Sequence, residues 1–215
     1  MHIPDGFLDA KTWIGLSVVS GGAIMVAAMR TRKEGDEKRI PLMGVMAAFI
    51  FAAQMINFPV AGGTSGHFVG GVLAALLLGP FTGVLIMSTV LIVQCLVFQD
   101  GGVTALGANI FNMGIVGSLG GYFIYKLLDA LLQRPRWMSK RNIIMIFSSA
   151  WVATVIASIF CAAELACSNT VPFRIAFPAM AGVHALIGIG EGLITIGVVS
   201  FIYRVRPDLF QVEKI

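Results

Sequence analysis

The first two residues of the chain carry three nitrogen atoms that can bind a single metal ion. They are the free α-amino group of Met1, the amide nitrogen of His2 and Nδ1 of the His2 ring. The amine and the amide close a five-membered chelate ring, and the amide and the imidazole close a six-membered one. Because the donors must be deprotonated to bind, the metal affinity should rise with pH. A deprotonated amide in a planar nitrogen set favours Ni²⁺ or Cu²⁺.

Three coplanar nitrogens leave a fourth position open, and His67 is the candidate ligand for it. The chain has three histidines, and by the topology derived below His2 and His67 lie on the same outer face. His67 ends a glycine-rich loop, residues 62–67, which is tolerated at membrane depth only where it lines a cavity or is buried in protein. The alternatives are that His2 merely follows the start residue, and that His67 hydrogen-bonds Ser65 or Thr64 in its own loop.

These groups must be positioned by membrane helices. The chain is 57% apolar and only 12% charged, whereas a soluble domain has about 25% charged residues. This composition excludes a soluble domain, a disordered tail and a nucleic-acid-binding module. Seven apolar runs mark the expected helices: Trp13–Met29, Ile40–Phe58, His67–Gly79, Phe81–Phe98, Asn109–Leu132, Ile143–Ala166 and Phe177–Tyr203. The three cysteines, Cys95, Cys161 and Cys167, are expected to pack as small buried hydrophobes.

The basic residues determine the topology. Of the fifteen Lys and Arg, thirteen lie in three clusters, between residues 30 and 39, 126 and 141, and 204 and 214. Because such residues concentrate in cytoplasmic loops, two spans must cross between residues 67 and 98, with Gly79-Pro80 as the inner turn. We therefore predict an all-α polytopic membrane protein with seven transmembrane helices, its N-terminus outside and its C-terminus cytoplasmic. The net charge of +4 then reflects topology and not a nucleic-acid partner.

We expect one transmembrane domain over residues 1–215, with residues 1–12 as an external N-terminal metal-binding segment. The first basic residue is Lys11, and Asp5 and Asp9 precede the first apolar run. This pattern is unlike that of a cleavable signal peptide, so Met1 should be retained.

Two further patterns lie within the apolar runs. His184 and Glu191 are seven residues apart and share a helix face; they either hold helices together or couple protons in a self-sufficient divalent cation carrier or channel. Gly44, Ala48 and Ala52 form a small-residue face that lets another helix approach closely. The sequence contains no P-loop, G-x-S-x-G or H-E-x-x-H motif, so we expect no enzymatic activity.

Several stretches resemble the nickel and cobalt S-components of energy-coupling factor (ECF) transporters, of the NikM/CbiM type. The similarity is strongest over Met1–Leu8 and Asn57–His67 and extends to Leu78–Pro80, Gln99–Gly102, Gly107–Asn112 and His184–Thr195. It implies a substrate-binding subunit of an ATP-driven importer in the prokaryotic cell (inner) membrane, with Ni²⁺ or Co²⁺ as transported ligand and no cofactor. It also implies that Met1 and His2 enter the bundle and complete the metal site with His67.

The resemblance further implies partners. These are a transmembrane T-component, which would contact the face of Gly44, Ala48 and Ala52, cytoplasmic ATPases that supply the energy, and in some systems a small accessory membrane subunit. S-components of this metal branch carry one extra N-terminal helix, which agrees with seven spans.

The leading hypothesis is capture of Ni²⁺ or Co²⁺ from outside by four nitrogens of Met1, His2 and His67, with the choice of metal left open. Metal ligands usually need hydrogen bonds that orient them. The candidates for this role are Asn57, Ser65, Gln94, Asp100 and Asn109.

Overall fold

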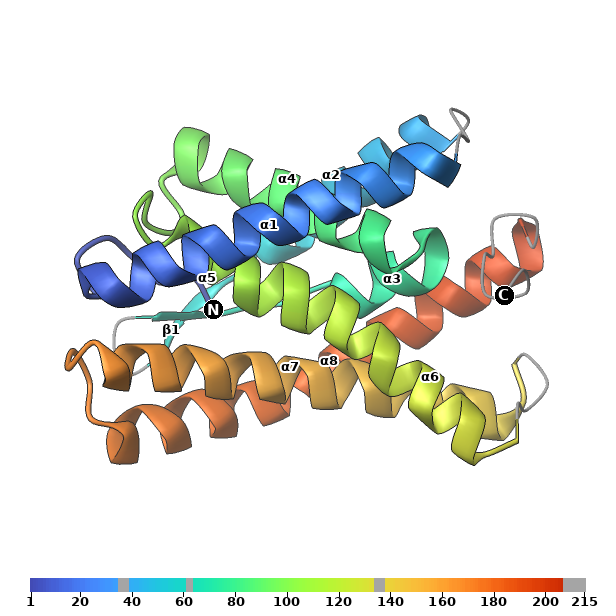
Figure 1. Cartoon of the computed structure of the whole chain (residues 1–215). Coiled ribbons are helices and arrows are strands. Elements are labelled where there is room, and N and C mark those ends of the chain that lie inside the picture. The colour runs from blue at the N-terminus through green and yellow to red at the C-terminus, as the bar shows by residue number, and fades with distance from the viewer. Residues whose placement is uncertain (35–38, 61–63, 134–137, 207–215) are drawn as a thin grey trace.

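A computed structural model of the chain describes residues 1–34, 39–60, 64–133 and 138–206. It is a helical bundle that encloses one short hairpin (Figure 1). The helices are α1 (Ala10–Glu34), α2 (Ile40–Gln54), α3 (Gly71–Leu78), α4 (Pro80–Phe98), α5 (Leu106–Ile110), the π-helical stretch η2 (Phe111–Gly120), α6 (Gly121–Leu131), α7 (Lys140–Cys167) and α8 (Phe173–Val205). The antiparallel strands are β1 (Phe58–Val60) and β2 (Thr64–Gly66).

Four of these helices, α1, α4, α7 and α8, are long and apolar enough to cross a membrane, since a span takes about 20 residues. The chain is therefore a helical, multi-pass membrane protein, as predicted. The count of seven spans and the orientation of the termini stay predictions. Within the described residues, the hairpin is a departure from helix that the sequence pattern did not indicate.

The break between the third and fourth apolar runs lies where the sequence placed it. Gly79 has φ +95°, a left-handed conformation that favours glycine, and Pro80 begins α4. Helix α3 is nevertheless only eight residues long, about 12 Å at 1.5 Å per residue, so it cannot span a membrane by itself. All eight of its residues are buried, which makes α3 the centre of the core.

The helix ends that carry basic residues lie at the same end of the bundle, as the charge pattern predicted. Figure 1 shows the carboxyl ends of α1, α6 and α8 toward one end of the bundle and the α7–α8 connection toward the other. Arg30, Arg32 and Arg204 belong to that first end. The basic residues Lys38, Arg134, Arg136 and Lys214, and positions 62 and 63 of the predicted metal-binding loop, lie outside the described residues.

The outer surface of the bundle is apolar, which suits contact with lipid. Val18 of α1 and Leu186 of α8 are 71% and 72% exposed. Cys95 and Cys161 are buried as expected, but Cys167 is exposed. The prediction was wrong for Cys167 because it is the last residue of α7 and follows the apolar run.

Candidate metal site

The N-terminal segment, residues 1–9, turns into the bundle. Met1, His2 and Ile3 are buried, with 0%, 4% and 0% of their surfaces exposed. The main chain of Ile3 is held on both sides, because its N–H donates to Asn109 Oδ1 at 2.9 Å and its carbonyl accepts from Asn109 Nδ2 at 3.2 Å. The Gly102 amide also donates to the Ile3 carbonyl at 2.9 Å. Asn109 and residue 102 thus fix the depth at which Met1 and His2 sit.

Asp5 joins this segment to the loop after α4. Its carboxylate accepts hydrogen bonds from the Val103 amide at 3.1 Å and from the amide and hydroxyl of Thr104 at 2.8 and 2.6 Å. The Thr104 hydrogen bonds hold the pKa of Asp5 below its usual value. Gly102 is needed for this approach, since a Cβ there would lie 2.3 Å from the Asp5 amide nitrogen.

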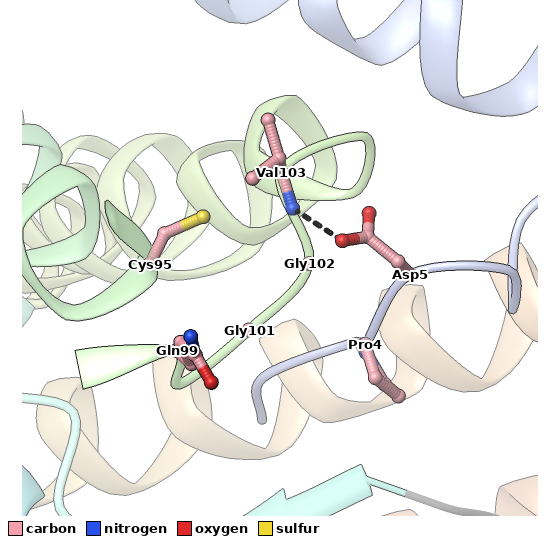
Figure 2. A pocket seen from close by; sticks show the side chains of 7 residues that line it. All are labelled: Pro4, Asp5, Cys95, Gln99, Gly101, Gly102 and Val103. Carbon is pink, nitrogen blue, oxygen red and sulfur yellow. Dashed lines mark hydrogen bonds between the residues drawn. The ribbon is translucent and has the colours of Figure 1, made fainter. Parts of the chain in front are cut away.

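A cavity of about 360 Å³ opens beside the N-terminal segment. Pro4 and Asp5 form one wall, and Cys95, Gln99 and residues 101–103 form the other (Figure 2).

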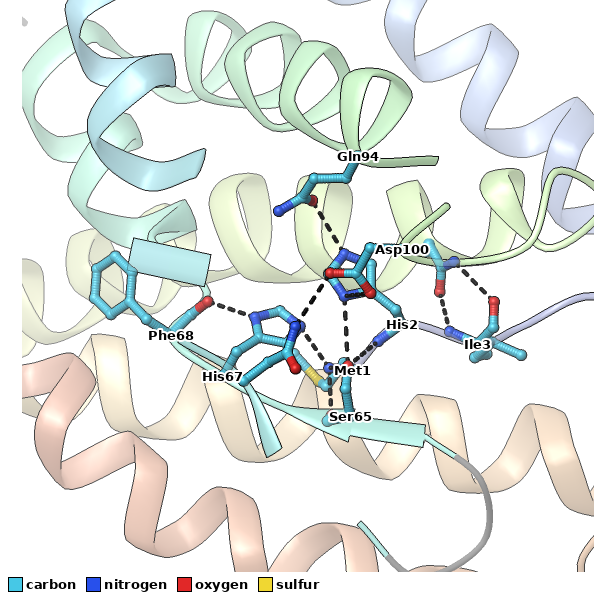
Figure 3. Close-up of polar contacts among 10 residues, drawn as sticks. Met1, His2, Ile3, Ser65, His67, Phe68, Gln94 and Asp100 are labelled. Carbon is cyan, nitrogen blue, oxygen red and sulfur yellow. Dashed lines mark hydrogen bonds and ion pairs between the residues drawn. The ribbon is translucent and has the colours of Figure 1, made fainter. Parts of the chain in front are cut away.

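The hairpin brings its second strand to the amino group. The Met1 amine donates to the Ser65 carbonyl at 2.5 Å and lies 3.3 Å from Ser65 Oγ. It also lies 2.7 Å from Nε2 of His67. Figure 3 shows the amine between Ser65 and the His67 ring. Two residues that are 66 positions apart thus present nitrogen atoms to each other inside the bundle.

The tautomer of His67 follows from its other nitrogen. Nδ1 lies 2.7 Å from the Phe68 carbonyl oxygen, which can only accept, so Nδ1 carries the proton. Nε2 is then left with a lone pair that faces the Met1 amine. This is the arrangement of a metal-binding histidine, whose second nitrogen donates to a carbonyl or carboxylate. With a proton on Nδ1 and a lone pair on Nε2, the His67 ring is neutral.

His2 presents Nδ1 to the same place. Its Nε2 lies 3.1 Å from Gln94 Oε1, an acceptor, so Nε2 carries the proton and Nδ1 the lone pair. Nδ1 is 3.3 Å from Asp100 Oδ1, but burial lowers the pKa of His2 to about 3, so this contact is not an ion pair at neutral pH. Two atoms with lone pairs face each other there, and a cation between them would be stabilised.

The remaining donor is the His2 amide. Its N–H donates to Ser65 Oγ at 3.1 Å. The imidazole rings of His2 and His67 stack at 4.5 Å with an interplanar angle of 23°. Burial lowers the pKa of the Met1 amine from 8.0 to about 5. At neutral pH the amine and both rings are therefore uncharged, and the amide alone must lose a proton to bind a metal.

The separation of the Met1 amine and His67 Nε2 fits one edge of a square plane of nitrogens. With metal–nitrogen bonds of about 2.0 Å, adjacent corners of such a plane lie about 2.8 Å apart. The amine and His67 Nε2 are separated by 2.7 Å. Among the described residues no three His, Cys, Asp or Glu side chains gather as a conventional metal cluster. Two of the four donors here belong to the main chain, and such a site leaves no cluster of side chains.

The structure brings the five predicted supporting residues to this place, at different distances from the ligands. Ser65, Gln94 and Asp100 contact Met1 or His2 directly. Asn109 acts one residue further on, through Ile3, and Asn57 contacts Asp100, with Nδ2 donating to Oδ2 at 3.3 Å.

His184 and Glu191 are both buried, and their hydrogen bonds go to main-chain atoms. His184 Nδ1 lies 2.8 Å from the Met180 carbonyl. Glu191 binds the main chain just after His67, a contact that the sequence did not indicate. The sequence analysis likewise did not identify Gly102, Gln54 or the Phe68 carbonyl as parts of the site. Of these three, only Gly102 was marked in the sequence, by the paired glycines at 101–102.

Comparison with known proteins gives the family. The family described as "Cobalt uptake substrate-specific transmembrane region" (CbiM) matches residues 2–209. The chain belongs to this family. The CbiM-family match thus covers nearly the whole chain, and the resemblance read from its motifs is confirmed.

Its relatives are named as transport proteins. A putative fused nickel transport protein NikMN of Archaeoglobus fulgidus is 42% identical over 98% of this chain and 68% of its own length. A putative cobalt transport protein CbiM of Methanococcus voltae is 32% identical over 98% of this chain and 95% of its own. A crystal structure described as a truncated transition metal transporter superposes with a TM-score of 0.86, at 32% identity, over 95% of this chain and 99% of that one. This CbiM-family chain is thus a multi-pass membrane component of prokaryotic metal transport.

Proposed function

We propose that this CbiM-family chain is the substrate-binding subunit of an ATP-driven ECF importer for Ni²⁺ or Co²⁺. In this proposal residues 1–215 form one transmembrane domain that catalyses no reaction. The observation that carries the proposal is the buried pair of nitrogens, the Met1 amine and His67 Nε2, at 2.7 Å. The four ligands are that amine, the His2 amide, His2 Nδ1 and His67 Nε2.

The surroundings support capture of a cation from outside. The cavity beside Asp5 reaches the inserted segment and is the proposed entrance. The carboxylates of Asp5 and Asp100 attract a divalent ion. On binding, the amide proton of His2 leaves, so the amide anion neutralises one of the two positive charges of the metal ion. Gln94 and Phe68, which accept from the distal ring nitrogens, keep both imidazoles aimed at the metal.

The proposal includes the membrane topology and the partners. The N-terminus and hairpin face outside, the basic ends of α1, α6 and α8 face the cytoplasm, and the chain crosses seven times. In the third crossing the non-helical residues 67–70 add to the length of the short helix α3. Gly44, Ala48 and Ala52 are all exposed on α2, as a contact for a T-component requires. A relative in Methanocorpusculum labreanum is named as a putative fused cobalt transport protein CbiMQ. We propose that this chain pairs with a separate membrane protein of that kind, with ATPases, and with an accessory membrane subunit.

Two variants test the ligand set by calorimetry with Ni²⁺ and Co²⁺. A Gly-Ser extension before Met1 converts the amine into an amide and should abolish tight binding. His67→Ala should weaken binding but leave the thermal unfolding of the metal-free protein nearly unchanged. Undiminished binding by the extended protein would remove the amine from the site. Equal loss of folding in His67→Ala would instead favour a structural role for that ring.

Transport in proteoliposomes tests the energy source. Uptake should require ATP and the partner subunits. Uptake by this chain alone, driven by a pH gradient, would favour the alternative of a self-sufficient proton-coupled carrier using His184 and Glu191.

A further inference from the structure

The carboxylate of Glu191 holds two consecutive main-chain amides just after His67. Its Oε2 accepts from the Val69 N–H and its Oε1 from the Gly70 N–H, both at 2.7 Å. Glu191 lies in α8, more than 120 positions away in sequence, and is 1% exposed. Each oxygen of the carboxylate thus accepts one main-chain hydrogen bond.

One of these amides belongs to the peptide group that orients His67. The Phe68 carbonyl and the Val69 N–H are the two ends of one peptide. His67 Nδ1–H donates to that carbonyl at 2.7 Å, and the N–H of the same peptide donates to Glu191. Consecutive hydrogen bonds of this kind polarise one another. The carboxylate therefore makes the Phe68 carbonyl a stronger acceptor, and through it makes His67 Nε2 a better electron donor.

The next peptide is held from two helices. The Val69 carbonyl accepts from Gln54 Nε2 of α2 at 2.7 Å, while the Gly70 N–H of that peptide donates to Glu191. Gly70 has φ +81°, and a Cβ there would lie 2.8 Å from Ile50, so the main chain is confined as well as hydrogen-bonded. Helices α2 and α8 together fix the chain that carries His67.

We propose that Glu191 is a positioning residue that orients and polarises His67 through the 68–69 peptide, with Gln54 holding the same chain from α2. The proposal rests on His67 being a metal ligand. A carboxylate that accepts from the second nitrogen of a metal-binding histidine orients the ring and makes it a better donor. Glu191 has this role here, but a peptide group lies between it and His67. This arrangement also makes the metal affinity depend on how α2 and α8 sit relative to each other.

The test compares two buried carboxylates in the full-length chain. Glu191→Gln places an NH₂ group against one of the two amides and breaks that hydrogen bond. Nickel affinity measured by calorimetry should fall on the order of 10–100-fold, as for other residues that support metal ligands. Glu164→Gln is the matched control, because Glu164 is also buried but accepts from Asn112 Nδ2 at 2.7 Å and not from the main chain after His67. Its nickel affinity should stay within twofold of the wild type.

A double-mutant cycle separates positioning from a general effect on folding. In a His67→Ala background Glu191→Gln should cost no further nickel affinity, because the ligand it positions is gone. The visible absorption band of bound Ni²⁺ should shift in Glu191→Gln toward that of His67→Ala. Equal losses in both backgrounds, or an equal loss in Glu164→Gln, would overturn the proposal.

Two further outcomes lead to different conclusions. If Glu191→Gln does not fold, Gln54→Met tests the other contact on the same chain and should show the same non-additivity with His67→Ala. If His67→Ala binds nickel as the wild type does, the proposed ligand set fails, and this result is independent of Glu191.

Discussion

At the scale of residues, the proposed metal site depends on nitrogens that burial keeps free of protons. A terminal amine in water is protonated at neutral pH and cannot bind a metal. Burial lowers the pKa of the Met1 amine to about 5 and that of His2 to about 3. In the proposed site the amine and the His2 ring are therefore neutral before the metal binds, and only the His2 amide proton remains to be displaced.

This leads to a prediction about pH. Between pH 5 and 8 one proton should leave per metal bound, so nickel affinity should rise roughly tenfold per pH unit. Below pH 5 the amine is protonated and competes with the metal, so the profile should steepen as pH falls. Calorimetry in buffers of different ionisation enthalpy measures the protons released. A flat profile between pH 6 and 8 would show that the amide nitrogen is not a ligand.

At the scale of elements, apolar runs and charge clusters predicted the helices well, because burial in lipid imposes them directly. The break at Gly79-Pro80 was equally readable. The sequence did not predict the shortness of α3, the hairpin or the stretch η2. These features depend on packing inside the bundle and not on the lipid around it. The candidate ligands were proposed from residue type together with position in the chain. The Glu191 contact was not, because only the fold brings α8 to the peptide after His67.

Helix α2 carries a prediction about partners. Its small residues Gly44, Ala48 and Ala52 are exposed, while Gln54 near its end holds the chain after His67. Ala48→Trp should leave nickel binding by the isolated subunit unchanged but weaken association with the T-component by about 1–3 kcal/mol, as overpacked contacts do. Co-purification with the partner subunits and ATP-driven uptake measure this effect.

Val18→Trp provides the control for that variant. Val18 is 71% exposed on α1, outside the small-residue face, so the same bulky side chain there should leave both assembly and uptake intact. If Ala48→Trp assembles and transports as well as Val18→Trp, the T-component contacts another surface.

At the scale of the whole molecule, the proposed topology brings the metal site and the exposed end of α7 to the same side of the membrane. Cys167 is the exposed cysteine at that end, whereas Cys95 and Cys161 are buried. A membrane-impermeant maleimide added to intact spheroplasts should therefore label the native chain once. Mass spectrometry of the purified chain counts the labels and locates them.

Cys167→Ser is the matched control and should abolish labelling without affecting nickel binding, because the cysteine lies away from the ligands. If labelling of Cys167 requires permeabilised membranes, the α7–α8 connection faces the cytoplasm. The inserted N-terminus and the cavity beside Asp5 would then open inward, since Thr170 of that connection donates to the Phe7 carbonyl at 2.5 Å and so shares one face of the molecule with the N-terminal segment. Labelling of Cys167 in intact spheroplasts therefore tests whether the proposed metal site opens to the outside, as an importer requires.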